Sequence, residues 1–197
     1  MKQIALLAAV VMLLSITSCG PKETNVERHI EINAPRAVVF HNFADFHQWT
    51  KWSPWYELDP NCAYTYYGDP GMVGHGYTWK SEKKDVGTGE MKITEATADD
   101  HIAFDLKFKE PWESASTGSL SVAEENGKSV VSWKMHMDHH GLSRVMMLFM
   151  DMDKMLGSDF EKGLAKMKTV DEAQAVQEAA KVAAEAAAAP ADSSVIK

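Results

Sequence analysis

Soft metal-ligand atoms gather in one stretch of the chain, Met135-His136-Met137-Asp138-His139-His140, which five further methionines follow between positions 146 and 155. Thioether and imidazole groups together can bind copper in oxidising compartments. Side chains alternate along a strand, so Met135 and Met137 are expected on the opposite face from His136, and only His139 and His140 are free to converge. The stretch therefore favours a soft apolar wall, with copper binding as the alternative.

Carboxylates that could act as general acids or bases are scattered. Glu90 and Asp105 fall on the polar side of alternating segments, so we expect both to face solvent. Glu113 ends the sequence Glu110-Pro111-Trp112-Glu113, a predicted hairpin end where a carboxylate could orient a ligand head group. The chain has no G-x-S-x-G, H-E-x-x-H, P-loop or paired C-x-x-C sequence. No catalytic residue, cofactor or metal ligand is assigned, and catalysis stays an alternative that requires a buried carboxylate or histidine in a pocket.

Tryptophans form the clearest binding pattern. Trp49, Trp52 and Trp55 recur at every third position, so they can line one side of a helical turn. Each indole combines a large apolar surface with one N–H, which suits the rim of a pocket for a mostly apolar ligand. The alternative is that the indoles only pack short helices onto the sheet.

The N-terminus is typical of an exported lipoprotein. Lys2 precedes an apolar run over 4–14, and Ile16-Thr17-Ser18-Cys19 resembles the lipobox of bacterial lipoproteins. We expect a signal peptide over 1–18, a lipid on Cys19 and a tether over 19–25. An ordinary secretory signal is the alternative. Residue 20 is Gly and not Asp, which favours anchoring in the outer membrane, facing the periplasm.

The net charge and the number of cysteines exclude two features, a nucleic-acid partner and an internal disulfide. The 197 residues include 20 Lys and Arg against 28 Asp and Glu, a net charge of −8. This balance argues against nucleic acid as a partner. With Cys19 lipidated, Cys62 is the single remaining thiol, so no internal disulfide is expected.

The elements that position these residues follow from hydrophobic periodicity. A strand is predicted over 27–33, a short helix after Pro35, a second short helix or turn over 45–51, and then an antiparallel meander. Asn126-Gly127 predicts a tight hairpin between its last two strands. The six meander strands are predicted over 64–67, 76–81, 89–95, 102–109, 116–122 and 129–138.

The C-terminal part changes to a helical period. Residues 141–168 place Leu142, Met146, Phe149, Met150 and further apolar residues on one stripe, which predicts a single long helix packed on the sheet. The Ala-rich segment 169–197 is expected to extend this helix up to Pro190 and to end in a disordered tail. The folded domain is therefore placed at 26–168.

A family resemblance follows from motifs in this domain, which are Phe46-x-x-Trp49-x-x-Trp52-Ser53-Pro54-Trp55, Gly87-x-Gly89-x-Met91 and Gly157-x-Asp159-Phe160-Glu161-x-Gly163-Leu164-x-x-Met167-Lys168. They resemble the polyketide cyclase/dehydrase-like branch of the START-related SRPBCC superfamily. The resemblance implies an α+β helix-grip fold, in which a curved antiparallel sheet of about seven strands wraps around a long C-terminal helix and encloses a hydrophobic pocket. It implies carriage or sensing of a hydrophobic small molecule, with cyclase, dehydrase or hydrolase activity as the alternative.

Face assignment and resemblance together predict a ligand-binding set. Its members are aromatic, aliphatic or thioether residues that should face the inside of the grip. They are Trp52, Trp55, Tyr77, Trp79, Met91, Phe104, Leu106, Trp133, Met135 and Met147.

Overall fold

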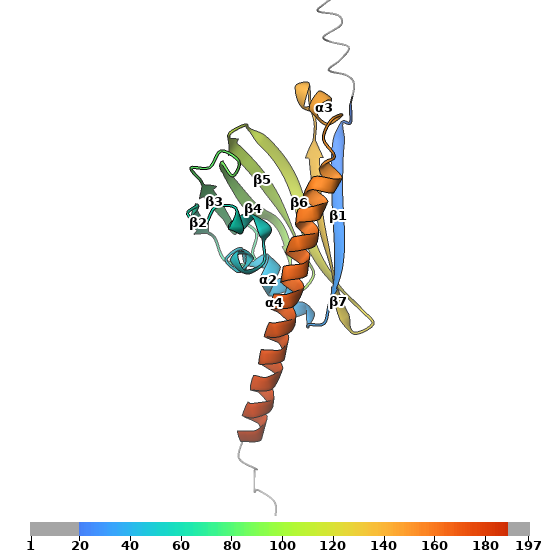
Figure 1. The fold of residues 1–197 in the computed structure, drawn as a ribbon. Helices are drawn as coiled ribbons and strands as arrows, with labels where there is room; N and C mark the ends of the chain where they lie inside the picture. Colours follow the sequence, from blue (N-terminus) through green and yellow to red (C-terminus); the bar gives the residue numbers. More distant parts are fainter. Residues whose placement is uncertain (1–19, 189–197) are drawn as a thin grey trace, which may run out of the picture.

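The computed structural model describes residues 20–188. Seven strands form one antiparallel sheet in the order β1-β7-β6-β5-β4-β3-β2, and a long C-terminal helix crosses its concave face (Figure 1). This is the α+β helix-grip architecture expected from the sequence. The strands are β1 (Glu23–Ile32), β2 (Ala63–Tyr67), β3 (Gly76–Lys80), β4 (Thr88–Thr97), β5 (His101–Glu110), β6 (Ser114–Glu125) and β7 (Lys128–Asp138).

Strand β1 begins earlier than expected. Residues 23–25, predicted to belong to the tether, pair with residues 136–138 of β7. Alternation alone could not place them in a strand, because all three side chains are polar and this end of β1 is buried only from Val26 onward.

Local features shape the sheet as the residue types suggest. Asn126 and Gly127 have φ values of 52° and 75°, so the β6–β7 hairpin has the positive-φ turn that Asn-Gly predicts. Register shifts interrupt the β4–β5 ladder between Thr88 and Gly89 and between Ile93 and Glu95. Such bulges bend a strand and increase its twist, which helps the sheet to curve around the helix.

Three short helices follow β1. The predicted first helix is α2 (Arg36–Ala44), whereas the predicted second helix over 45–51 is a 3₁₀ helix, η1 (Gln48–Lys51), followed by another, η2 (Pro54–Glu57). Pro54 explains the division, because a proline restricts the preceding residue to extended conformations and is itself favoured at the first position of a helix.

The predicted single helix over 141–168 is wrong. The structure has a short helix α3 (Leu142–Met146) and, after a break, the long helix α4 (Met152–Ala188). Asp151 begins α4, because its Oδ1 accepts a hydrogen bond from the Lys154 backbone N–H at 3.0 Å, as an N-cap residue does. Helical periodicity does not detect an N-cap residue. The apolar residues before Asp151 fitted the helical spacing of the predicted stripe, although they do not pack on the sheet.

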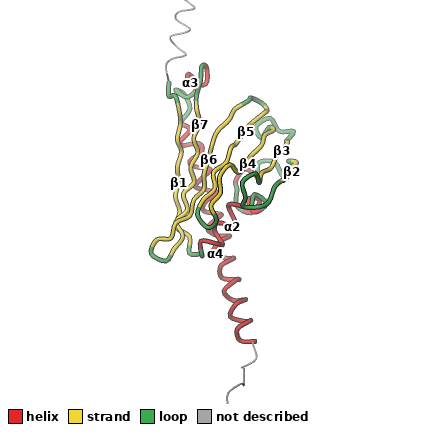
Figure 2. The backbone as a smooth tube through the Cα atoms, turned by 180° about the vertical axis from the view of Figure 1, so that it is seen from behind, coloured by secondary structure: helices red, strands yellow, loops and turns green. Residues whose placement is uncertain are grey.

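Helix α4 packs on the sheet along its first part and extends beyond the sheet along its last part. Phe160, Leu164 and Met167 are buried under the sheet, whereas every residue over 176–188 is exposed. Figure 2 shows the free end of α4 beyond the sheet. No helix in the described part of the chain is both long enough and apolar enough to cross a membrane. The predicted signal peptide and Cys19, and the tail from 189 onward, lie outside the described residues.

Candidate functional site

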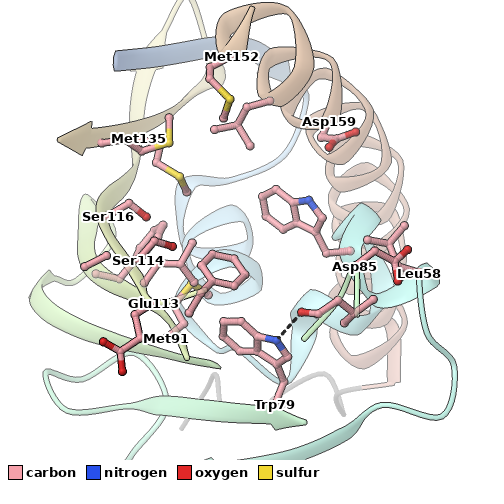
Figure 3. A pocket seen from close by; sticks show the side chains of 18 of the residues that line it. Leu58, Trp79, Asp85, Met91, Glu113, Ser114, Ser116, Met135, Met152 and Asp159 are labelled. Carbon is pink, nitrogen blue, oxygen red and sulfur yellow. Dashed lines mark hydrogen bonds between the residues drawn. The ribbon is translucent and has the colours of Figure 1, made fainter. Parts of the chain in front are cut away.

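A pocket of about 880 Å³ lies between the concave face of the sheet, the 3₁₀ helices and the first turns of α4 (Figure 3). Met135 of β7 and Met152 of α4 point into it from one side, and Trp79 of β3 closes the other (Figure 3). Most of the lining is aromatic, aliphatic or thioether. The apolar lining residues are Trp49, Trp55, Tyr56, Leu58, Tyr64, Tyr77, Trp79, Val86, Met91, Phe104, Leu106, Phe108, Ala115, Trp133, Met135, Met137, Met147, Met152 and Leu156.

The structure brings most of the predicted set together. The residues of that set that line the pocket are Trp55, Tyr77, Trp79, Met91, Phe104, Leu106, Trp133, Met135 and Met147. Trp52 is the exception, because it lies outside the lining and only 1% of it is exposed. Its indole Nε1 donates to the Asn42 carbonyl oxygen at 3.1 Å, and its ring packs against those of Trp49 and Trp133. For Trp52, the structure therefore agrees with the alternative that the indole only packs short helices onto the sheet.

Two glycines let the largest rings lie flat on the sheet. Gly89 pairs with Trp79, and a Cβ atom at position 89 would lie 2.3 Å from the Trp79 ring. Gly118 pairs with Phe104 in the same way, with a Cβ atom 2.5 Å from the Phe104 ring. A glycine in a strand interior often marks such a close approach. The pocket wall therefore depends on these glycine–aromatic pairs.

Tyrosines that sequence reasoning missed form a second wall. Tyr56 of η2 and Tyr64 of β2 stack at 4.4 Å between ring centroids, and both line the pocket. The Tyr56 and Tyr66 hydroxyl groups are 2.9 Å apart, within hydrogen-bond distance. Burial raises the pKa of Tyr56, Tyr64 and Tyr77, so their hydroxyls stay neutral at physiological pH. Alternation in residues 64–67 could have indicated Tyr64, whereas no sequence period indicates Tyr56.

Charged lining residues all carry the same sign. Asp85, Glu113, Asp138 and Asp159 line the pocket, and no lysine or arginine does. The Glu113 side chain turns away from the others (Figure 3), and the Asp159 carboxylate lies 3.4 Å from Lys162 Nζ. The remaining polar lining consists of Ser114, Ser116, Ser143, His139 and His140. The pocket is thus apolar with an acidic polar margin.

One part of the arrangement expected for catalysis is present among the described lining residues. The one buried imidazole there is His139, whose Nε2 lies 2.7 Å from Thr24 Oγ1. Its carboxylate neighbour Asp138 is exposed. The buried carboxylates Asp45, Asp59 and Asp171 and the buried imidazole of His75 lie outside the lining. A paired buried acid and base is therefore not assembled in the pocket.

The Met-His segment divides between the two faces of β7, as alternation predicts. Met135 and Met137 line the pocket, whereas His136 lies on the other face, with its Nδ1 2.8 Å from Asn25 Oδ1. Two groups of described histidines and carboxylates bring their ligand atoms within 4.8 Å of one another. Glu23, His136 and Asp138 form one of them, and neither group contains His139 or His140. In the more buried group, His75 Nε2 already accepts the Phe46 backbone N–H at 3.1 Å.

Comparisons with known proteins agree with this fold. The family described as "Polyketide cyclase / dehydrase and lipid transport" matches residues 23–172. A solved protein from Chromobacterium violaceum is 12% identical with a TM-score of 0.54, covering 75% of this chain and 96% of its own. A protein from Nitrosospira multiformis is 16% identical with a TM-score of 0.55, covering 75% and 96%. One from Rhizobium loti is 17% identical with a TM-score of 0.55, again covering 75% and 96%. A search of curated proteins gave no match.

Proposed function

Because the chain belongs to the polyketide cyclase/dehydrase and lipid transport family, we propose that it is a carrier or sensor that binds a hydrophobic or amphipathic small molecule. The observation that carries this proposal is the pocket of about 880 Å³ with its largely apolar lining. This volume lies within the range of small-molecule binding sites. Burial of apolar ligand surface contributes about 25 cal/mol per Å², so the apolar body of the ligand supplies most of the affinity.

The acidic margin specifies the polar part of that ligand. An anionic group would meet only carboxylates among the charged lining residues, and like charges repel strongly where water is excluded. A hydroxyl or amine can donate hydrogen bonds to the carboxylates and to the serines Ser114 and Ser116. The pocket therefore favours an amphiphile with a neutral or cationic head group over a fatty acid or a phosphodiester.

The ligand class is tested with brominated amphiphiles that share one tail. Trp55, Trp79 and Trp133 line the pocket, so a bromine atom bound there quenches their fluorescence. A chain that begins at Gly20 is titrated with 11-bromoundecanol, 11-bromoundecyl trimethylammonium and 11-bromoundecanoate. We expect saturable quenching by the first two and at least tenfold weaker binding of the carboxylate. Equal affinities would overturn the head-group preference, and no quenching by any of them would overturn the proposed function.

Neighbouring residues on β5 supply a matched pair of variants. Leu106 lines the pocket, whereas Lys107 points to the other face of the sheet. Leu106→Phe adds volume inside the pocket and should weaken 11-bromoundecanol binding severalfold, because an overfilled cavity excludes the ligand. Lys107→Phe introduces the same ring on the opposite face of the sheet and should leave 11-bromoundecanol binding unchanged. Equal effects of the two variants would contradict the pocket as the binding site.

The proposal includes a location. The lipobox-like sequence that ends at Cys19 supports a lipid-anchored protein of the bacterial cell envelope, in the outer membrane and facing the periplasm. Acyl chains contribute about 0.8 kcal/mol per buried CH₂ group, so several chains anchor a protein firmly. Radiolabelled palmitate should be incorporated into the protein in growing cells and should not be incorporated into Cys19→Ser. Labelling of both forms, or of neither, would overturn the anchor.

A further inference from the structure

Six apolar side chains near the start of α4 face solvent instead of the core. They are Leu142, Met146, Leu148, Phe149, Met150 and Met155, and we call them the apolar tip. Phe149 is 86% exposed and Leu142 is 69% exposed. Scattered exposed apolar residues need no explanation, but a contiguous group of this kind marks an interaction surface. The pocket does not use these side chains, because none of the six lines it.

The first described residue is held against this tip. Arg144 of α3 donates from Nη2 to the Gly20 carbonyl oxygen at 2.7 Å. Gly20 has a φ of 113°, and a Cβ atom there would lie 2.1 Å from the Arg144 carbonyl oxygen. Figure 1 shows that the chain enters β1 beside α3, at the end of the molecule opposite to the free end of α4. The described chain therefore begins, at Gly20, beside the apolar tip.

The pocket extends to the same end, and we call the part lined by the exposed His140 the pocket mouth. His140 precedes the tip residues in the chain, whereas Ser143, Met147 and Met152 lie between them, and all four line the pocket. The β5–β6 turn lies at this end too. Strand β6 runs antiparallel to β7, so β6 begins beside the end of β7. The end of β7 in turn pairs with the start of β1, where Glu23 lies opposite Asp138. That turn contains Trp112, which is 64% exposed. Tryptophan prefers the boundary between lipid and water.

The tip has few polar groups that would oppose insertion into lipid. The backbone N–H groups of Met147, Leu148 and Phe149 donate to carbonyl oxygens within the same segment, at 3.0 to 3.2 Å. Over residues 142–150 the one charged side chain is Arg144, which is bound to Gly20. The acidic residues that follow are also engaged, because Asp151 caps α4 and Asp153 pairs with Arg28 at 3.0 Å. Insertion would therefore leave few polar groups unpaired.

We propose that the apolar tip, together with Trp112, docks into the surface of a lipid bilayer and turns the pocket mouth toward the membrane. This inference rests on the anchor proposed at Cys19, which would place acyl chains beside the tip. An amphiphile dissolved in the bilayer would then enter the pocket without crossing water. A bilayer is favoured over a second copy of the chain because Gly20, which directly follows the lipobox-like sequence, is bound to Arg144 at the tip.

The depth of the tip in a membrane tests the proposal. The full chain, purified from membranes, carries Cys62→Ser and a nitroxide label at Phe149→Cys, and is reconstituted in vesicles of phosphatidylethanolamine and phosphatidylglycerol. Collision of the label with oxygen, which concentrates in lipid, is compared with collision with a water-soluble nickel complex. The control label is at Val182→Cys, an apolar position of α4 that is 65% exposed at the opposite end. The oxygen-to-nickel ratio should be severalfold higher at 149 than at 182.

Each other outcome counts against the proposal. Equal ratios at the two positions would show that the tip stays in water. A label at 149 that neither reagent reaches, with dipolar broadening from another label, would show that a second copy covers the tip. Since Phe149→Cys itself removes apolar surface, a label at Met146→Cys gives an independent reading. Leu148→Ser with Met150→Ser should return that label to water.

The anchor and the pocket are checked in the same sample. Mass spectrometry of the N-terminal peptide records whether Cys19 carries acyl chains, and binding of 11-bromoundecanol records whether the pocket functions. A label that remains in water on a lipidated, ligand-binding protein overturns the docking proposal alone. A sample that lacks the acyl chains or the binding activity identifies a failure of the proposed function instead.

Discussion

Glycines under aromatic rings set the shape of the pocket at the scale of single residues. Trp79 and Phe104 each lie across a glycine of the neighbouring strand, so at that position each ring approaches the backbone closely. The Trp79 indole is also fixed at its polar end, because Nε1 donates to the Val86 carbonyl oxygen at 3.2 Å. These rings are consequently held in one orientation along the pocket wall.

We predict that Gly89→Ala weakens both binding and folding. The new methyl group would overlap the Trp79 ring at 2.3 Å and the Lys107 carbonyl oxygen at 2.5 Å, so the ring would be displaced. Overpacking of this kind costs about 1–3 kcal/mol of folding stability, and the displaced indole should reduce 11-bromoundecanol affinity severalfold. Urea unfolding and bromine quenching measure the two effects. Gly127→Ala is the control, since no atom lies within 4 Å of its Cβ position, and it should affect stability alone through its positive φ. Unchanged ligand affinity in Gly89→Ala would contradict the role given to Trp79.

At the scale of elements, polar contacts join both ends of the packed part of α4 to the rest of the fold. Near its start, the Arg28 guanidinium passes over Gly157 and reaches Asp153 and Glu161 at 3.0 and 2.8 Å. Further along, Asn42 of α2 donates from Nδ2 to Asp171 Oδ1 at 2.7 Å. The first contact is an exposed ion pair, which contributes little to stability. The second is fully buried and is therefore the more consequential.

The Asp171 contact predicts a pH dependence of stability. Burial raises the pKa of the Asp171 carboxyl to about 7, whereas an aspartate in an unfolded chain titrates near pH 4. The folded state therefore binds a proton that the unfolded state releases between about pH 4 and pH 7, and stability falls as pH rises through this window. The expected loss is roughly 4 kcal/mol from this residue.

Asp171→Asn removes this titration while keeping an oxygen for the Asn42 amide. In urea unfolding at pH 5, 6, 7 and 8, the variant should become more stable than the unmodified protein as the pH rises. Glu185→Gln, on the exposed part of α4, should instead follow the unmodified protein throughout. Parallel curves for Asp171→Asn and the unmodified protein would show that the Asp171 carboxyl does not titrate in this range.

The whole molecule has two different ends. Helix α3 and the start of β1 lie at one end, and α4 extends from the other (Figure 1). The 37 residues of α4 span about 55 Å at 1.5 Å per residue. The exposed part over 176–188 contacts little of the body and resembles a spacer more than a part of the core.

Truncation tests this division. A chain that stops after Glu178 loses mostly exposed residues, so its free energy of unfolding should change by about 0.5 kcal/mol or less and its ligand affinity should not change. A chain that stops after Thr169 also loses the buried Asp171 contact and should be clearly less stable. Urea unfolding compares the two. A large loss of stability in the chain that stops after Glu178 would show that the exposed end of α4 packs on the rest of the molecule.

Much of this molecule could be predicted from local patterns. Alternation of apolar and polar residues placed Phe104 and Leu106 inside and Lys107 outside, because a strand turns successive side chains to opposite faces. The same rule separated Met135 and Met137 from His136. The Asn126-Gly127 turn and the strand order of the meander followed from chemistry that acts within a few residues. Local patterns, together with the family resemblance, also indicated nine of the residues that line the pocket.

Tertiary structure alone decided the remaining features. Periodicity records that a residue is apolar, but not whether anything packs against it, so Phe149 and Met146 were assigned to the core and are exposed instead. Trp52 and Trp55 share one spacing, yet only Trp55 reaches the pocket, because the course of the chain after Pro54 separates them. Whether the space inside the grip is filled depends on how far the sheet curves around α4, and that curvature results from contacts between residues far apart in the sequence.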